Sequence, residues 1–289
     1  MTAVREQVGV LSFDTFVAPP VPIVTNDLPP GHSVRTWSPI AATLICGERD
    51  AVLVDPLLTR QQGRALADWV AASGKNLTTV YITHGHGDHW FGLGAVRERY
   101  PNVRAVATAP VVEYMRQQAS PKVFANWTSR FPGQIQRNVA VAEPLTDPRF
   151  ELEGHELLVV ETGHTDTDQT TALHVPSIDL VVAGDVVYND VHLYLAESDH
   201  ARRLEWIHAL DAVEALRPRN VVAGHKRPGR PDDPKTVEET RTYICDFDRL
   251  AERTSTADEL YEQMLFLHPD RVNPGVLWGS AVATHGRLR

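Results

Sequence analysis

A six-residue segment, His84-Gly85-His86-Gly87-Asp88-His89, constrains this chain more than any other feature of its sequence. It follows the apolar run at residues 80–82 and precedes a helical pattern that begins at Trp90. Four side chains that can bind a metal lie within these six residues, and the packing of a core does not explain that density. The sequence therefore predicts a metal site at the end of a strand.

The spacing of the four side chains indicates that they form two pairs, which point to different places. His84 and His86 are two residues apart, so their side chains project to the same side while the chain stays extended. Asp88 and His89 follow at the start of the helix, where a turn directs them toward a second point, and the two glycines permit that turn. Neutral imidazoles with a carboxylate suit Zn²⁺, and iron and manganese accept the same donors.

Further residues of ligand type follow three other predicted strands. His164 comes after the apolar run at 157–160, Asp185 after 180–183 and His225 after 220–223. Asp185 and His225 each come directly after a glycine. This recurrence places all three at one edge of a sheet, where the chain converges on a cleft.

The rest of the chain alternates short β-branched runs with helical patterns, which is typical of an α/β protein whose sheets are covered by helices. We predict helices at 60–72, 90–99, 111–118, 202–216, 234–254 and 257–267. The predicted strands are 41–46, 51–54, 79–83, 103–108, 156–160, 170–175, 180–183 and 220–223. We expect a single domain over 1–289, with an extended, proline-rich lead-in at about 1–37 and a C-terminal helical or tail segment at about 234–289. Its last part, 266–289, is either a tail or a flap over the site.

These residues resemble the metallo-β-lactamase-fold hydrolase superfamily, whose signature is His-x-His-x-Asp-His, then a third histidine, a bridging aspartate and a last histidine. The resemblance extends over about residues 38–228 and implies a four-layer αββα sandwich. The implied ligands of one metal are His84, His86 and His164. Those of the other are Asp88, His89 and His225, with Asp185 as the bridge and Asp55 orienting the ligand loop from behind. Because all seven ligands are present, two Zn²⁺ ions are the expected cofactors, with iron or manganese as the alternatives.

Such a centre points to metal-assisted hydrolysis of a small molecule. Two divalent ions about 3.5–4 Å apart share a water, lower its pKa toward neutrality and polarise a carbonyl or phosphoryl oxygen. Asp185 can span both ions, and Asp88 is placed to handle the proton. Tyr188 lies three residues after Asp185 and resembles the tyrosine of the quorum-signal lactonases of this superfamily, which donates to the carbonyl or leaving oxygen; packing beside the strand is the alternative.

The bond cleaved is expected to be of the carbonyl type, in a lactone, a β-lactam-like amide or a thioester. Phosphodiester hydrolysis and mononuclear iron dioxygenase chemistry remain alternatives on the same fold, because ligand types alone do not fix the metal. A binding module that has lost catalysis is disfavoured by the complete ligand set.

Residues near the motifs suggest the walls of the pocket, each with a structural alternative. Four side chains either line an apolar pocket or pack in the core: Trp90, Phe91, His192 and Tyr194. Three basic side chains either receive an anionic group or belong to a solvated loop: Lys226, Arg227 and Arg230. Residues 113–144 form a cap over the pocket or part of the core.

Charge and composition argue against several partners. The chain has 28 Lys+Arg against 37 Asp+Glu, and this net charge of −9 disfavours nucleic acid as a partner. No apolar run approaches the roughly 20 residues that span a bilayer, and no secretory signal is visible. We therefore expect a soluble, cytoplasmic protein without a membrane partner. Motifs of serine hydrolases, phosphate loops and dinucleotide-binding folds do not occur in the sequence. The sequence does not predict an oligomeric state.

Overall fold

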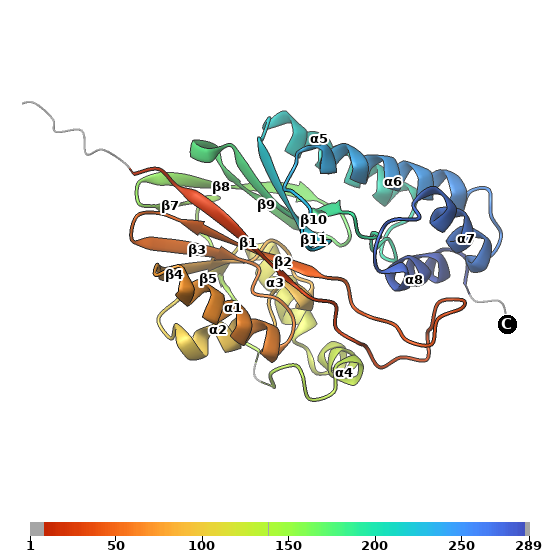
Figure 1. Ribbon diagram of the computed structural model, residues 1–289, viewed down its shortest axis with the longest axis horizontal. Coiled ribbons are helices and arrows are strands. Elements are labelled where there is room, and N and C mark those ends of the chain that lie inside the picture. The colour runs from red at the N-terminus through yellow and green to blue at the C-terminus, as the bar shows by residue number, and fades with distance from the viewer. Residues whose placement is uncertain (1–8, 138, 287–289) are drawn as a thin grey trace, which may run out of the picture.

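A computed structural model describes residues 9–137 and 139–286 (Figure 1). The first eight residues of the predicted lead-in and the last three of the predicted C-terminal segment lie outside the described residues. No described helix has the length and apolar character needed to cross a membrane.

The predicted helices are present, with small shifts at their ends. The observed bounds are α1 (Arg60–Ala72), α2 (Leu93–Arg99), α3 (Ala109–Gln118), α5 (His200–Ala215), α6 (Lys235–Ala251) and α7 (Ala257–Leu267). The helix predicted from residue 90 starts three residues later, because a short 3₁₀ turn, η1 (Gly87–His89), precedes it. A second 3₁₀ turn is η2 (Pro176–Ile178).

The predicted strands are present as well. Their bounds are β2 (Ile40–Cys46), β3 (Asp50–Val54), β4 (Asn76–Tyr81), β5 (Arg104–Ala107), β8 (His155–Gly163), β9 (Thr170–Val175), β10 (Leu180–Asn189) and β11 (Asn220–Lys226). β10 continues six residues beyond its predicted end, so Asp185 and Tyr188 lie within the strand rather than after it. Its register shifts against β11 on both sides of Gly184, where the backbone has φ +52°.

Several elements were missed from the sequence. β1 (Ser12–Ala18) lies inside the expected lead-in and pairs with β2 along its whole length. Short strands β6 (Glu143–Pro144) and β7 (Arg149–Leu152) were also not predicted. Helix α4 (Pro121–Arg130) lies in the inserted stretch 113–144, which was expected to be helical but without bounds for a helix. α8 (Pro274–His285) lies in the last part of the expected C-terminal helical or tail segment, where no separate helix was predicted. Its proline occupies the first helical turn, where the missing N–H is not needed.

The strands form one curled sheet in the order β6-β5-β4-β3-β2-β11-β10-β9-β8-β7, with β1 added beside β2. β3, β4 and β5 run parallel, as do β10 and β11, so their carboxyl ends meet at common edges. β2 and β11 join the two halves of the sheet through a single register pair, His225 with Ile40.

Along the central strands, successive side chains point alternately to opposite faces of the sheet, and this alternation produces four layers. Ala42 and Leu44 of β2 pack into a core beneath α1–α4, whereas their neighbours Ala41 and Ile45 face a core between the two halves of the sheet. β10 and β11 alternate in the same way between this inner core and a third core beneath α5–α8. Figure 1 shows the two helical groups on opposite sides of the curled sheet. The predicted αββα sandwich is confirmed.

Candidate metal centre

The histidine-rich loop follows β4 and is packed too tightly for side chains at its glycines. A Cβ on Gly85 would lie 2.2 Å from Cδ1 of Tyr114, and one on Gly87 would lie 2.3 Å from Cε2 of Phe91. Both rings therefore press on the backbone of the loop, which fixes its path. This packing determines where the histidine side chains emerge.

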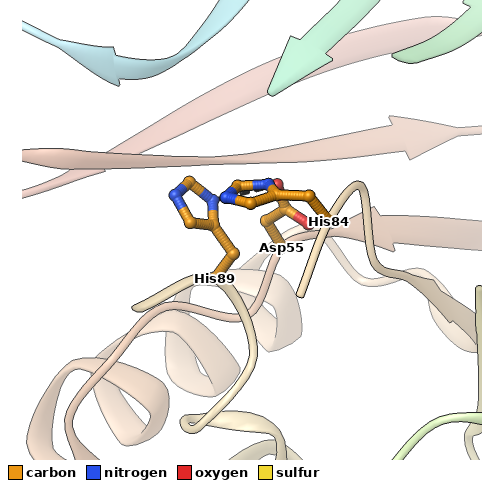
Figure 2. A group of neighbouring side chains, drawn as sticks. All are labelled: Asp55, His84 and His89. Carbon is orange, nitrogen blue, oxygen red and sulfur yellow. Dashed lines mark hydrogen bonds and ion pairs between the residues drawn. The ribbon is translucent and has the colours of Figure 1, made fainter. Parts of the chain in front are cut away.

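Asp55 holds the loop from behind, as expected. It follows β3 with φ +56°, and its carboxylate accepts hydrogen bonds from the backbone N–H of Thr83 at 2.9 Å and from Thr83 Oγ1 at 2.6 Å. It also contacts Nδ1 of His89 at 3.1 Å, and Figure 2 shows its carboxylate beside the rings of His84 and His89. With Nδ1 engaged in this way, Nε2 of His89 faces the site.

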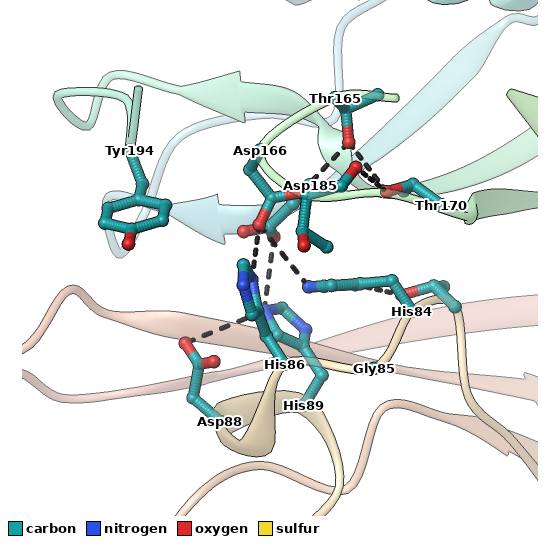
Figure 3. Close-up of polar contacts among 12 residues, drawn as sticks. His84, Gly85, His86, Asp88, His89, Thr165, Asp166, Thr170, Asp185 and Tyr194 are labelled. Atoms are coloured by element: carbon teal, nitrogen blue, oxygen red, sulfur yellow. Dashed lines mark hydrogen bonds and ion pairs between the residues drawn. The ribbon is translucent and has the colours of Figure 1, made fainter. Parts of the chain in front are cut away.

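His84 and His86, two of the three ligands expected for the first metal, lie together with a further side chain, Asp166. Asp166 Oδ2 lies 2.6 Å from Nδ1 of His86 and 3.6 Å from Nε2 of His84, and these three side chains form a group whose ligand atoms lie within 4.8 Å of one another (Figure 3). Among the described residues, no group of that spacing includes His164. Its Nδ1 contacts Asp168 Oδ1 at 2.9 Å, while the carboxylate of Asp166 takes the place beside His86.

The second group is the predicted one. Asp88, His89 and His225 bring their ligand atoms together within the same spacing. His225 Nδ1 contacts the backbone oxygen of Pro39 at 3.0 Å, which directs its Nε2 into the site, 3.4 Å from Asp88 Oδ2. Asp185 lies beside this group, with its two oxygens each 3.2 Å from a different histidine Nε2, that of His89 and that of His225.

Four buried polar atoms at this centre have no hydrogen-bond partner among the described residues: Nε2 of His84, His89 and His164, and Oδ1 of Asp185. An unpaired buried polar group costs about 1–3 kcal/mol, so four at one place call for a common partner. Imidazole nitrogens and a carboxylate oxygen are donors that zinc and its neighbours in the first transition row accept. The residues present therefore fit a divalent metal.

Carboxylates dominate the electrostatics of the centre. Burial alone would lower the pKa of His225, but Asp185 and Asp88 outweigh it and raise that pKa to about 10. Burial would raise the pKa of Asp88, yet His89 and His225 keep it below its ordinary value. The centre thus has a negative potential that attracts cations.

The ligands face a cleft of about 380 Å³. Tyr194 lines it as expected, and so does Trp127 from the predicted cap at 113–144. The C-terminal helix α8 contributes Val276 and Gly279, so residues of the segment expected to be a tail or flap form part of the wall.

Other expected wall residues are not in the cleft. Trp90 and Phe91 are buried in the core beneath α1–α4. His192 is also fully buried and contacts the hydroxyl of Tyr243 at 2.9 Å. The three basic residues after the last predicted ligand are held in ion pairs: Lys226 with Asp232, and Arg227 and Arg230 with Asp190.

The sequence analysis missed three polar residues at the site. The indole Nε1 of Trp37 donates to Asp88 Oδ2 at 2.8 Å. Glu197 Oε1 lies 3.3 Å from Nε2 of His86, and Glu197 Oε2 accepts from Thr167 Oγ1 at 2.8 Å. Asp166 is the third. Only Asp166 had a sequence signal, a carboxylate two residues after a predicted ligand.

Comparisons with known proteins agree with this geometry. The model of the metallo-beta-lactamase superfamily matches residues 35–225. A metallo-beta-lactamase family protein from Thermus thermophilus is 22% identical, with a TM-score of 0.59, over 93% of this chain and 91% of that chain. A metallo-beta-lactamase from Pontibacter korlensis is 16% identical, with a TM-score of 0.58, over 80% of this chain and 99% of that chain.

A third structure, a metallo-beta-lactamase from Pseudomonas aeruginosa in its mono-zinc form, is 15% identical, with a TM-score of 0.56, over 82% of this chain and 92% of that chain. At these identities the likeness to solved structures establishes the fold alone. No curated protein matches the sequence.

Proposed function

This chain belongs to the metallo-beta-lactamase superfamily, whose members are metal-dependent hydrolases, and we propose that it is a dinuclear zinc hydrolase that cleaves a carbonyl-type bond in a small molecule. The candidate bonds are those of a lactone, a β-lactam-like amide and a thioester. A cleft of about 380 Å³ beside the ligands has the size of a small-molecule site.

Asp185 carries the proposal. Its Oδ1 and Oδ2 each lie 3.2 Å from an Nε2 of the second group, that of His89 and that of His225. Its negative charge also acts on His84 of the first group, where it opposes the lowering of the His84 pKa by burial. Oδ1 is buried and has no hydrogen-bond partner among the described residues. A carboxylate beside both groups would be suited to hold two ions at once. His84, His86, Asp166 and His164 would be the candidate ligands of one ion, and Asp88, His89 and His225 those of the other.

When bound, the two ions would make hydroxide available at neutral pH and polarise the carbonyl of the substrate. Asp88 stays ionised beside His89 and His225 and can accept a proton, and the bond from Trp37 Nε1 fixes the direction of its carboxylate. Tyr188 donates its hydroxyl to Asp185 Oδ2 at 2.7 Å and also lines the cleft. Burial, and next the charge of Asp185, raise the pKa of Tyr188, so its hydroxyl remains protonated. Its one proton would pass from the hydrogen bond with Asp185 to one with a developing oxyanion when the hydroxyl turns.

The test combines metal analysis with substrate turnover. Protein purified without added metal is analysed for its elements and assayed with a lactone, a chromogenic cephalosporin, a thioester and a phosphodiester. We expect two zinc per chain and turnover of a carbonyl substrate. One iron per chain without hydrolysis would instead favour dioxygenase chemistry, and turnover of the phosphodiester alone would favour a phosphodiesterase.

A variant pair tests the role of Asp185. Asp185→Asn keeps the size of the side chain but removes its charge, so we expect at least about a hundredfold loss of kcat together with loss of metal. Asp211→Asn, on the exposed face of α5, is the matched control and should retain both. An unchanged rate in Asp185→Asn would contradict the dinuclear mechanism.

A further inference from the structure

Two guanidinium groups lie in the wall of the cleft that faces the metal centre. Arg35 precedes β2, Arg130 is the last residue of α4, and both line the cleft. The segment before β2 holds them near each other, because the backbone N–H of Ile23 donates to the oxygen of Arg35 and that of Val24 to the oxygen of Arg130, each at 3.0 Å. The three cations considered from the sequence do not line this cleft, and they form ion pairs outside it: Lys226, Arg227 and Arg230.

Only one nitrogen of the Arg35 guanidinium forms hydrogen bonds with the described residues. Its side chain is only 15% exposed, and Nη1 donates to Asp27 Oδ2 at 2.9 Å and to the backbone oxygen of Asp27 at 3.2 Å. Nε and Nη2 form no hydrogen bond with the described residues. Helix α8 leaves room for the side chain, because a Cβ on Gly275 would lie 2.8 Å from Arg35 Cγ and one on Gly279 would lie 2.7 Å from Nη2.

Arg130 is exposed and forms no ion pair with the part of the chain that the structure describes. The pKa of Arg35 is lowered, first by burial and also by the positive charge of Arg130, against the opposing effect of Asp27. Two like charges that share a cleft repel each other, and an anion bound between them removes that repulsion. Guanidinium groups also match the geometry of a carboxylate, which accepts two parallel hydrogen bonds.

We infer that the substrate carries a carboxylate that Arg35 and Arg130 bind while its scissile carbonyl lies at the metal centre. This inference rests on the proposed hydrolytic function and narrows its substrate class. Asp27 and Glu197 line the same cleft, and their negative charges oppose a dianionic phosphate more strongly than a singly charged carboxylate.

The backbone sets the distance between the two ends of such a substrate. Trp37 contacts the ligand Asp88, and Arg35 lies two residues earlier in a segment that forms an isolated bridge through Thr36. In an extended chain these two side chains project to the same side, about 7 Å apart. A test substrate is therefore chosen with a spacer of this order between its carboxylate and its carbonyl.

Two esters with the same leaving group test the inference. Mono-4-nitrophenyl adipate and 4-nitrophenyl hexanoate differ at the far end of the acyl chain, where the first has a carboxylate and the second a methyl group. For the zinc-loaded protein we expect kcat/KM to be at least about tenfold higher for the adipate ester, as for a hydrogen bond to a charged group. Arg130→Gln and Arg35→Gln should each reduce this preference about tenfold, chiefly through KM.

Arg99→Gln is the matched control, because Arg99 is exposed at the end of α2 and pairs with Asp68. It should retain the preference of the unmodified protein. Equal kcat/KM for the two esters, or a preference that survives in Arg130→Gln, would overturn the inference. Arg130 is exposed, so its variant decides the question even if Arg35→Gln does not fold.

A binding measurement separates this inference from the proposed function. Adipate is titrated into metal-free protein, and quenching of the tryptophan fluorescence is followed, since Trp37 and Trp127 line the cleft. Binding that is lost in Arg130→Gln, without turnover of either ester, would keep the inference and refute the proposed function. Ester turnover without adipate binding, or inorganic phosphate binding as tightly as adipate, would keep the function and refute the inference.

Discussion

Tyr188 donates a hydrogen bond directly to Asp185, the carboxylate that we propose as the bridge, so the contribution of its hydroxyl can be tested with one substitution. It is 1% exposed and donates to Asp185 Oδ2 at 2.7 Å. We expect Tyr188→Phe to lower kcat by about tenfold to a hundredfold, as for the loss of a hydrogen bond to a charged group, with a smaller change in KM. Steady-state kinetics with the best substrate of the panel measure both constants.

The control for this prediction is Tyr261→Phe. Tyr261 is buried beneath α5–α8, and its hydroxyl has no hydrogen-bond partner among the described residues, so its removal should leave kcat unchanged. If Tyr188→Phe loses zinc but keeps kcat per bound metal, Tyr188 positions Asp185 and does not donate to the substrate.

The burial of His192 predicts how the free energy of unfolding depends on pH in acid. It is fully buried, and burial, with smaller contributions from Arg271 and His268, lowers its pKa to about 3. Because this folded-state value lies below the ordinary 6.5, the unfolded chain binds the extra proton first, and stability falls as the pH drops from about 6.5 toward 3. The slope from this one group is at most about 1.4 kcal/mol per pH unit.

Urea unfolding of metal-free protein between pH 6 and pH 4 measures that slope. His192→Asn keeps a polar atom near Tyr243 but does not titrate, so its free energy of unfolding should depend less on pH than that of the unmodified protein. His208→Asn is the control, because the side chain of His208 is 80% exposed. If the free energies of unfolding of His192→Asn and of the unmodified protein depend on pH in the same way, His192 is not the source of the pH dependence.

At the scale of elements, the close contact between β10 and β11 positions the carboxylate of Asp185. A Cβ on Gly224 would lie 2.1 Å from Asp185 Oδ1 and 2.8 Å from the backbone carbon of Gly184. We therefore expect Gly224→Ala to displace Asp185, to lower the zinc content and to reduce activity at least tenfold. Gly9→Ala, where the nearest atom would be 3.9 Å away, is the control.

Elemental analysis and kinetics of the two variants test this contact. Full zinc content and full activity in Gly224→Ala would mean that β11 can move away from β10 without disturbing the centre.

Periodicity predicted the elements better than their ends. Helix α1 was predicted to the residue, because Thr59 caps it in a box with Gln62 and the apolar spacing is regular. β10 continued past its predicted end because its register shift keeps the chain extended beyond Gly184, which no local pattern records. β1 was missed because its alternation is weak, with only its last residue fully buried.

The same contrast holds for the site: residues that follow a local pattern were predicted, and residues that only tertiary structure brings to the site were not. The histidine loop, Asp185 and His225 follow apolar strands, so the sequence could place them together. Trp37, Glu197 and Arg130 reach the cleft from irregular segments or from the end of a helix that was not predicted, and only tertiary structure brings them there. His164 was grouped with His84 and His86 by resemblance, whereas the hydrogen bond of Asp166 to His86 depends on local geometry after β8.

At the scale of the whole molecule, the metal centre lies where the two halves of the sheet meet. The histidine loop follows β4 in one half, and Asp185 and His225 belong to β10 and β11 in the other. Figure 3 shows Asp185 opposite the histidines of the loop. Between the halves, β2 and β11 share only one register pair. Ions held by ligands from both halves would therefore crosslink the molecule at the join of β2 and β11, the described strand pair with the fewest register pairs.

Removal of metal should consequently destabilise the entire fold. At a free zinc concentration about a thousandfold above Kd, binding adds about 4 kcal/mol to the free energy of unfolding, which corresponds to a change in Tm of roughly 10 °C for a chain of this size. Thermal unfolding with and without a chelator measures the shift, and added zinc should reverse it.

The segments in which hydrogen exchange increases after chelation show whether the ions crosslink the two halves of the sheet or stabilise the whole fold evenly. After chelation, hydrogen exchange should increase most in β2 and β11, while the core of β3 and β4 beneath α1 remains protected. His86→Ala, which removes one ligand, should show a smaller Tm shift on chelation than the unmodified protein. A chelated protein with zinc fully removed but an unchanged Tm would mean that packing of the two halves through the inner core, rather than the ions, holds the molecule together.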